Sequence, residues 1–185
     1  YSSPYSKCML PEGLCIVDCP LGMVKINNDC VEVCGDGIKS VFTPEDYCDD
    51  GNNNDHDGCS SDCHVEPGYV CINGGPTQAD YCSLPPHLTL EQSKENLNII
   101  LLKFSKDMNL QKDINDLAKI TLSATDPSLY KYSIKRLDNR IFEVDISPLK
   151  SLPAQDIIIQ FNPIKLVTDT AGIYILQDIY TLHIK

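Results

Sequence analysis

Residues 34–71 read CGDGIKSVFTPEDYCDDGNNNDHDGCSSDCHVEPGYVC, and this stretch decides how the first part of the chain folds. It is rich in Cys, Gly, Asn and Asp and poor in aliphatic side chains. A segment of this kind cannot offset its loss of conformational entropy by burying apolar surface. We therefore expect disulfides to hold it, each contributing about 2–5 kcal/mol.

Cysteine is confined to the first 82 residues of the 185-residue chain. The ten cysteines are Cys8, Cys15, Cys19, Cys30, Cys34, Cys48, Cys59, Cys63, Cys71 and Cys82. Cysteine at about 12% of a segment is typical of disulfide scaffolds, and an even number at close spacing predicts pairing. Disulfides persist in oxidising compartments, so we expect an extracellular or cell-surface protein. We also expect that a signal peptide has been removed and that Tyr1 lies near the mature N-terminus.

Charge changes at the same point as cysteine content. Residues 1–82 carry fourteen acidic side chains and three lysines, whereas residues 83–185 carry twelve acidic and twelve basic side chains. The sequence Ser-Leu-Pro-Pro at 83–86 is typical of a stiff linker. We predict an N-terminal segment with a first cysteine-rich unit over 1–33, a second cysteine-rich unit over 34–82, and another domain over 83–185.

Composition also excludes some partners. The formal net charge is −11, and the chain has no basic cluster of the kind that binds nucleic acid. No apolar run approaches the ~20 residues of a membrane-spanning helix. We therefore expect neither a nucleic-acid partner nor a membrane span.

The order of cysteine, glycine and acidic residues in 34–71 resembles the Myxococcus-type cysteine-rich disulfide repeat. The matching pieces are CGDG at 34–37, EDYCDDGN at 45–52, DGCSSDC at 57–63 and EPGYVC at 66–71. The match extends to 34–82 if Cys82 closes the unit. This family occurs in large secreted and surface proteins of bacteria, ciliates and related protists. The resemblance implies a stapled extracellular module without catalytic activity.

A second resemblance covers the preceding residues. CIVDCPLG at 15–22, followed by CVEVC at 30–34, is similar to growth-factor-receptor-type cysteine-rich repeats. Paired C-x3-C segments in that family usually bond in alternation. The resemblance therefore implies the disulfides Cys15–Cys30 and Cys19–Cys34, and Cys8 lies outside the pattern.

The acidic residues of the second cysteine-rich unit suggest a cation site. NNDHDG at 53–58 places oxygen-bearing side chains at alternate positions before a glycine, as calcium loops do. The candidate calcium ligands are Asp49, Asp50, Asn53, Asp55, Asp57 and Asp62. His64 stands where an EF-hand has its bidentate glutamate, so this is not an EF-hand. Asp and Asn also form turns by bonding to the backbone, so a calcium site and a set of solvated turn residues are both open interpretations.

The remainder of the chain has the period of β-strands. We predict strands over 88–90, 99–104, 120–122, 130–135, 142–147, 157–161 and 180–185, and a short helical turn within 109–119. The runs at 99–104, 120–122 and 157–161 are the most continuously apolar, and we expect them at the centres of sheets. About seven strands in roughly 100 residues predict an all-β Ig-like sandwich after the small disulfide-rich module.

Two motifs add a resemblance for this second part. LKFSKDM at 102–108 resembles a strand of the bacterial-type Ig-like domains of S-layer and other surface proteins. VTDTAG at 167–172 is similar to their later turn, and 180–184 to their last strand. Such domains serve as spacers, stalks and adhesive modules.

The sequence offers no recognisable catalytic constellation. The four histidines are His56, His64, His87 and His183, and none has a Ser or Cys nucleophile in a known motif. Cys59, Cys63 and His64 are zinc-ligand types, but ten cysteines in this framework favour five disulfides. We expect no enzymatic activity, and calcium is the one cofactor that the sequence leaves open.

These features predict a structural subunit of a surface fibre, coat or stalk. The alternative is an adhesion or ligand-binding module of a larger surface protein, and a third interpretation is a calcium-tuned regulator or protease-associated domain. The expected partners are other copies of the chain or other surface proteins. Tyr1, Ser2, Ser3, Pro4 and Tyr5 form a segment that could pair with a neighbour's sheet edge, or be a frayed terminus.

Glycosylation motifs are sparse. The chain contains no N-x-S/T sequon, so any surface glycan would be O-linked, at residues such as Ser2, Ser3 or Thr77.

Overall fold

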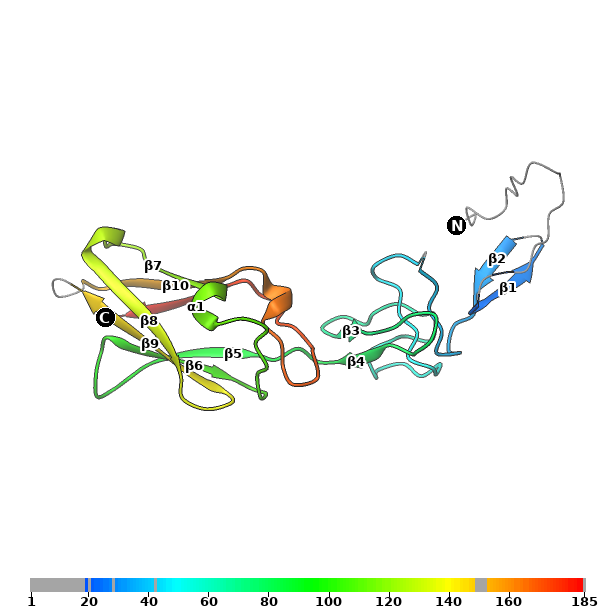
Figure 1. The fold of residues 1–185 in the computed structure, drawn as a ribbon, viewed down its shortest axis with the longest axis horizontal. Coiled ribbons are helices and arrows are strands. Elements are labelled where there is room, and N and C mark those ends of the chain that lie inside the picture. The colour runs from blue at the N-terminus through cyan, green and yellow to red at the C-terminus, as the bar shows by residue number, and fades with distance from the viewer. Residues whose placement is uncertain (1–18, 20, 28, 42, 149–152, 185) are drawn as a thin grey trace. The chain divides into compact units, whose positions relative to one another are not determined.

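The computed structural model describes residues 19, 21–27, 29–41, 43–148 and 153–184 (Figure 1). Cys8, Cys15 and the predicted self-assembly segment 1–5 therefore lie outside the described residues. The chain divides into two compact units, one ending at Leu84 and the other beginning at Pro85.

The first unit consists of two small hairpins and the loops between them (Figure 1). In the first hairpin, β1 (Met23–Ile26) pairs with β2 (Asp29–Glu32), and in the second, β3 (Val70–Ile72) pairs with β4 (Tyr81–Ser83). The buried centre of the second cysteine-rich unit is formed by Cys48, Cys59 and Cys63 rather than by aliphatic side chains. Disulfides therefore take the place of a large apolar core, as the composition predicts.

The eight described cysteines form four disulfides. These are Cys19–Cys30, Cys34–Cys63, Cys48–Cys59 and Cys71–Cys82. Cys71 and Cys82 are direct partners in the register of β3 and β4, so their bond crosses that hairpin. The chain is therefore disulfide-rich over the segment where the sequence predicts it.

The alternating pairing implied by the growth-factor-receptor resemblance is wrong. Cys30 bonds to Cys19, not Cys15, and Cys34 bonds to Cys63, not Cys19. The hairpin explains the first bond, because it turns the chain back and Val33 N donates to Gly22 O at 2.9 Å. Cys34 follows that hairpin and belongs to the acidic loops of the next segment.

The second unit consists of two antiparallel sheets (Figure 1). The four-stranded sheet has the order β5 (Leu88–Gln92), β6 (Ile99–Phe104), β9 (Ile141–Pro148) and β8 (Tyr130–Arg136). The three-stranded sheet has the order β11 (Ile179–Ile184), β10 (Gln155–Phe161) and β7 (Ala118–Leu122). Each strand overlaps one that the sequence predicts, from alternation for β8, β9 and β11 and from continuous apolar runs for β6, β7 and β10.

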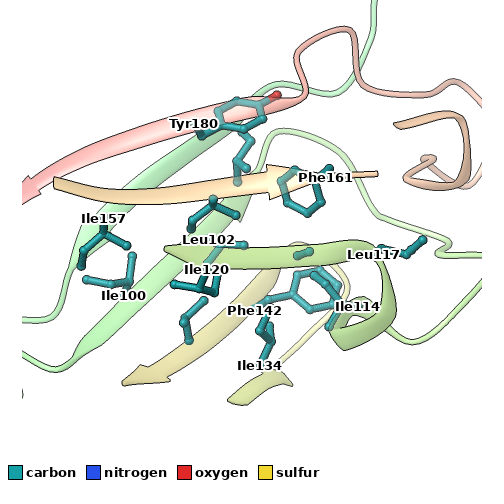
Figure 2. Close-up of a cluster of buried hydrophobic side chains, with 14 of the residues drawn as sticks. Ile100, Leu102, Ile114, Leu117, Ile120, Ile134, Phe142, Ile157, Phe161 and Tyr180 are labelled. Carbon is teal, nitrogen blue, oxygen red and sulfur yellow. The ribbon is translucent and has the colours of Figure 1, made fainter. Parts of the chain in front are cut away.

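The apolar positions of both sheets meet in one core (Figure 2). Ile100 and Leu102 come from the four-stranded sheet, and Ile120, Ile157 and Phe161 come from the three-stranded sheet. All five are at most 2% exposed. Burial of one such side chain contributes about 1.5–3 kcal/mol, so this unit needs no disulfide.

One expectation about this unit is confirmed and another is corrected. The short helical turn predicted within 109–119 is α1 (Ile114–Leu117), with Asp113 as its N-cap, and Ala118 begins β7. β7 is an edge strand, not a central one, because it pairs only with β10. Its apolar run reflects burial of one face, since Ile120 and Leu122 point into the core while Lys119 is exposed.

The described residues of the second unit also include two short 3-10 helices. They are η2 (Pro127–Leu129) and η3 (Ile164–Leu166). Over the part of the chain that the structure describes, no helix has the length and apolarity needed to cross a membrane.

Candidate functional site

Asp49 lies at the centre of the acidic loops, and backbone N–H groups donate hydrogen bonds to both oxygens of its carboxylate. Oδ2 accepts a hydrogen bond from Gly35 N at 3.0 Å, and Oδ1 accepts from Gly37 N at 2.8 Å and Gly51 N at 3.0 Å. The three glycines have φ of 85°, 77° and 86°, a region that non-glycine residues rarely adopt. A single buried carboxylate therefore organises the glycine turns of both the CGDG and CDDGN motifs.

A second buried carboxylate, Asp80, was missed by the sequence analysis. Its side chain is fully buried, accepts from the N–H groups of Asp49 and Gly74 at 3.0 Å each, and forms an ion pair with Lys39 Nζ at 2.9 Å. Asp80 lies outside the matching motifs, two residues before the closing Cys82. A single acidic residue at that position belongs to no motif, so the sequence alone does not indicate that the fold places it against Asp49.

Glu66 fixes the loop between Cys48 and Cys59. Its Oε1 accepts from His56 N at 2.7 Å, and its Oε2 accepts from Gly58 N at 2.8 Å. Residues 53–57 (NNDHD), at the tip of the loop that Glu66 holds, are all exposed. The loop is therefore held at its base by a disulfide and a bidentate carboxylate while its acidic tip faces solvent.

The other predicted calcium ligands are distributed around this loop. Asp50 accepts from Asn52 N at 3.2 Å, Asp55 accepts from Ser61 N at 2.8 Å, and Asp62 accepts from the Ser60 hydroxyl. The side chain of Asn53 lies against Gly35, where an added Cβ would come within 2.4 Å of Asn53 Oδ1. Asp57 has neither a hydrogen bond nor an ion pair to any described residue.

These side chains do not converge as one cation cage in the described structure. Cys48, Cys71 and Cys82 are the one group of Cys, His, Asp or Glu residues there with three ligand atoms all within 4.8 Å of one another. All three sulfur atoms are already in disulfides. The turn-forming interpretation accounts for Asp49, Asp50 and Asp55, and calcium binding by the exposed acids stays the untested alternative.

The pKa shifts in this region follow burial and like charge. Burial raises the pKa of Asp50, and the negative charge of Asp57 adds to the increase. Burial is also the main cause of the raised pKa values of Glu32 and Tyr47. By contrast, hydrogen bonds from Ser61 lower the pKa of the exposed Asp55.

In the second unit, the D-x-x-G motif at 169–172 is structural. Asp169 is buried, and its Oδ1 accepts from Ala171 N and Ile173 N at 2.9 Å each. Its Oδ2 lies 3.4 Å from Lys106 Nζ. The carboxylate closes the turn before the last strand.

Comparison with protein families gives a match over part of the first unit. Residues 16–64, about a quarter of the chain, match a family described as "Domain of unknown function (DUF4215)". This match and the four disulfides fit a cysteine-rich repeat. Searches of curated proteins and of solved structures give no match.

Proposed function

We propose that the chain is a non-enzymatic extracellular structural protein, a subunit of a surface fibre, coat or stalk that assembles through repeated domain contacts. The observation that carries this proposal is the succession of two compact units that are stabilised by different means. Disulfides hold the first and an apolar core holds the second. Separately stabilised modules in series are well suited to extracellular assemblies, and the disulfides indicate an oxidising compartment.

We infer that the second unit is an Ig-like sandwich. If β5 to β11 are lettered A to G, the two strand orders become A-B-E-D and G-F-C. These are the sheets of the constant-type Ig domain. The unit contains no cysteine, so the likeness is one of topology and not of the disulfide of antibody domains. A spacer or adhesive module is a common use of this topology, which supports a structural role.

We also infer that residues 34–82 form a Myxococcus-type repeat. The glycines of its CGDG and CDDGN motifs both donate to Asp49, which gives those motif positions a physical reason. The role of Glu66 as a clamp gives a reason for the glutamate of the EPGYVC motif. These contacts support a rigid module, since Asp49 and Glu66 each accept hydrogen bonds from the backbone of turns.

The surroundings of the histidines support a non-enzymatic role. Nδ1 of His64 lies 2.9 Å from the carbonyl oxygen of Asp62, and Nδ1 of His183 lies 2.9 Å from Oδ1 of Asp156. A general base needs the proton of a nucleophile within hydrogen-bond reach. Among the described residues, no serine hydroxyl or cysteine thiol hydrogen-bonds to the ring of His64 or His183, so neither ring has a nucleophile in place to deprotonate.

Self-association is the test of the proposal. We expect the purified chain to sediment as a concentration-dependent series of species heavier than 20.6 kDa, and to form periodic fibres in negative-stain images. A monodisperse species of 20.6 kDa at every concentration would contradict the polymer proposal and favour an adhesion or ligand-binding module. Intact-mass measurement of native material tests the proposed O-linked glycan, for which exposed Thr77 is the described candidate.

A further inference from the structure

The two edge strands β7 and β8 border an open depression on the second unit. Its volume is about 470 Å³. Its lining includes Lys119 and Thr121 from β7, Pro127 from η2, and Lys131 and Tyr132 from β8. We call this depression the basic groove, because its lining contains Lys119 and Lys131, two of the three lysines of β7 and β8, and no acidic residue.

Two of these lysines have no partner of opposite charge. Lys119 and Lys131 are exposed, and neither forms an ion pair with any residue in the described ranges. Lys135 differs, because it stands directly opposite Glu143 in the register of β8 and β9. The groove therefore presents two unneutralised ammonium groups beside exposed Pro127 and half-buried Tyr132.

The backbone edges beside the groove are already occupied by side chains. The Tyr130 hydroxyl donates to Ile120 O at 3.3 Å and accepts from Leu122 N at 3.4 Å on β7. The Asn115 amide bonds both the N–H and the C=O of Ile134 on β8, at 2.9 Å each. Because side chains already bond to these backbone groups, the edges are poorly suited to the addition of another strand. The groove is thus suited to a partner that binds through charged side chains and not through a sheet ladder.

The first unit carries a complementary feature in the exposed residues 53–57, which we call the acidic loop. Asp57 has no counter-charge among the described residues, and Asp55 uses one oxygen to accept from Ser61 N. The base of the loop is fixed by Glu66 and by the Cys48–Cys59 disulfide. A loop that is already ordered loses little entropy when it binds.

We propose that the acidic loop of one copy of this chain docks in the basic groove of a second copy. This inference rests on the proposed self-assembling function and names its contact. The contact joins two different surfaces, so it is heterologous and can repeat without closing. Charge complementarity of this kind steers association and fixes the register of the partners. It also weakens with salt, because screening at 0.1 M acts over about 10 Å.

Charge reversal on each side tests the contact in the full chain. The groove variant is Lys119→Glu with Lys131→Glu, and the loop variant is Asn54→Lys with Asp57→Lys, which leaves the Asp55–Ser61 hydrogen bond in place. Lys94→Glu with Lys165→Glu is the matched control, because these exposed lysines lie outside the groove. Thermal unfolding of each variant checks that its fold is retained.

Sedimentation velocity gives the readout, at about 20 mM and about 500 mM salt. We expect each single-sided variant to weaken association about tenfold or more at low salt, and the control to change it little. An equimolar mixture of groove and loop variants should restore association, because each reversed surface then meets its complement. High salt should weaken association of the unsubstituted chain.

The failures of the two proposals are distinguishable. If the unsubstituted chain never associates, both the self-assembling function and this contact are overturned. If it associates but the groove variant behaves like the control, the contact is overturned and the assembly proposal stands. The contact is also overturned if the equimolar mixture of the two variants associates no more strongly than either variant alone.

Discussion

Asp49 and Asp80 bond reciprocally. The N–H of Asp80 donates to the carbonyl oxygen of Asp49 at 2.6 Å, and the N–H of Asp49 donates to Oδ2 of Asp80 at 3.0 Å. The Asp49 side chain then holds the glycine turns, while the Asp80 side chain holds Gly74 and Lys39. Two buried carboxylates thus connect the first motif of the repeat to its last hairpin.

Removal of the Asp80 carboxylate is expected to destabilise the first unit strongly. Asp80→Ala leaves the N–H groups of Asp49 and Gly74 without their acceptor and Lys39 without its counter-charge. Breaking a buried pair costs about 3–5 kcal/mol, and we expect the lower end because Lys39 is 21% exposed. Calorimetry under non-reducing conditions should show a lower unfolding temperature for the first unit and an unchanged one for the second unit. A loss below about 1 kcal/mol would contradict this role.

The close approach of Asp80 to the backbone requires glycine at position 74. A Cβ on residue 74 would lie 2.2 Å from Asp80 Cγ, so Gly74→Ala must displace the buried carboxylate. We expect a loss of about 2 kcal/mol or more. Gly75→Ala is the matched control, because nothing lies within 4 Å of a Cβ there. Equal midpoints of chemical unfolding for the two variants would rule out the steric explanation.

The sequence is most informative where structure depends on local pattern. Alternation along 142–147 predicts β9, because Phe142, Val144 and Ile146 face the core whatever their partner strand. The same logic does not reveal that β7 is an edge strand, since burial of one face gives the same apolar run in either place. Strand order is a property of the whole unit.

Long-range contacts in the candidate site could not be predicted from spacing. The Cys34–Cys63 disulfide spans 29 residues, and its pairing depends on how the Asp49 turns fold between the two cysteines. The acidic motif over 49–62 predicts a cation site or a set of turn-forming residues. It does not separate Asp49, whose carboxylate faces backbone N–H groups, from Asp57, which faces solvent.

Glu32 is expected to make stability depend on pH in the acidic range. Burial raises the pKa of Glu32 above its ordinary value of 4.5, and the negative charges of Asp36 and Asp49 add to the increase. Above pH 4.5 and up to its raised pKa, the folded chain therefore binds more protons than the unfolded chain at this site. Its contribution to stability is present at lower pH and is lost as pH rises through this window.

Glu32→Gln should remove that dependence and raise stability at neutral pH. Exposed carboxyls whose pKa values are lowered, such as Asp55 and Asp107, act in the opposite direction but are common to both proteins. The difference in unfolding free energy between variant and parent, measured from pH 4 to 7, therefore isolates Glu32. A difference that is constant across this range would contradict the shift.

Calcium removal tests the two interpretations of the acidic residues. We expect the first unit to keep its fold in EDTA, because backbone N–H groups already satisfy Asp49 and Asp55. Its unfolding temperature should be the same in EDTA and in millimolar calcium, with magnesium at equal ionic strength as the control. A calcium-specific increase would instead support a cation site at the exposed acids.

The Tyr130 hydroxyl is expected to stabilise the edge of β7 that pairs with no strand. It bridges Ile120 O and Leu122 N at 3.3 and 3.4 Å, so Tyr130→Phe leaves two backbone groups of an edge strand without their partner. Because these bonds are long, we expect a loss of about 0.5–1.5 kcal/mol, confined to the unfolding transition of the second unit. Tyr132→Phe is the matched control, since its hydroxyl bonds to no described residue. If both variants lose the same stability, the loss comes from removing any hydroxyl in this region. It would then not come from the two hydrogen bonds of Tyr130 to β7.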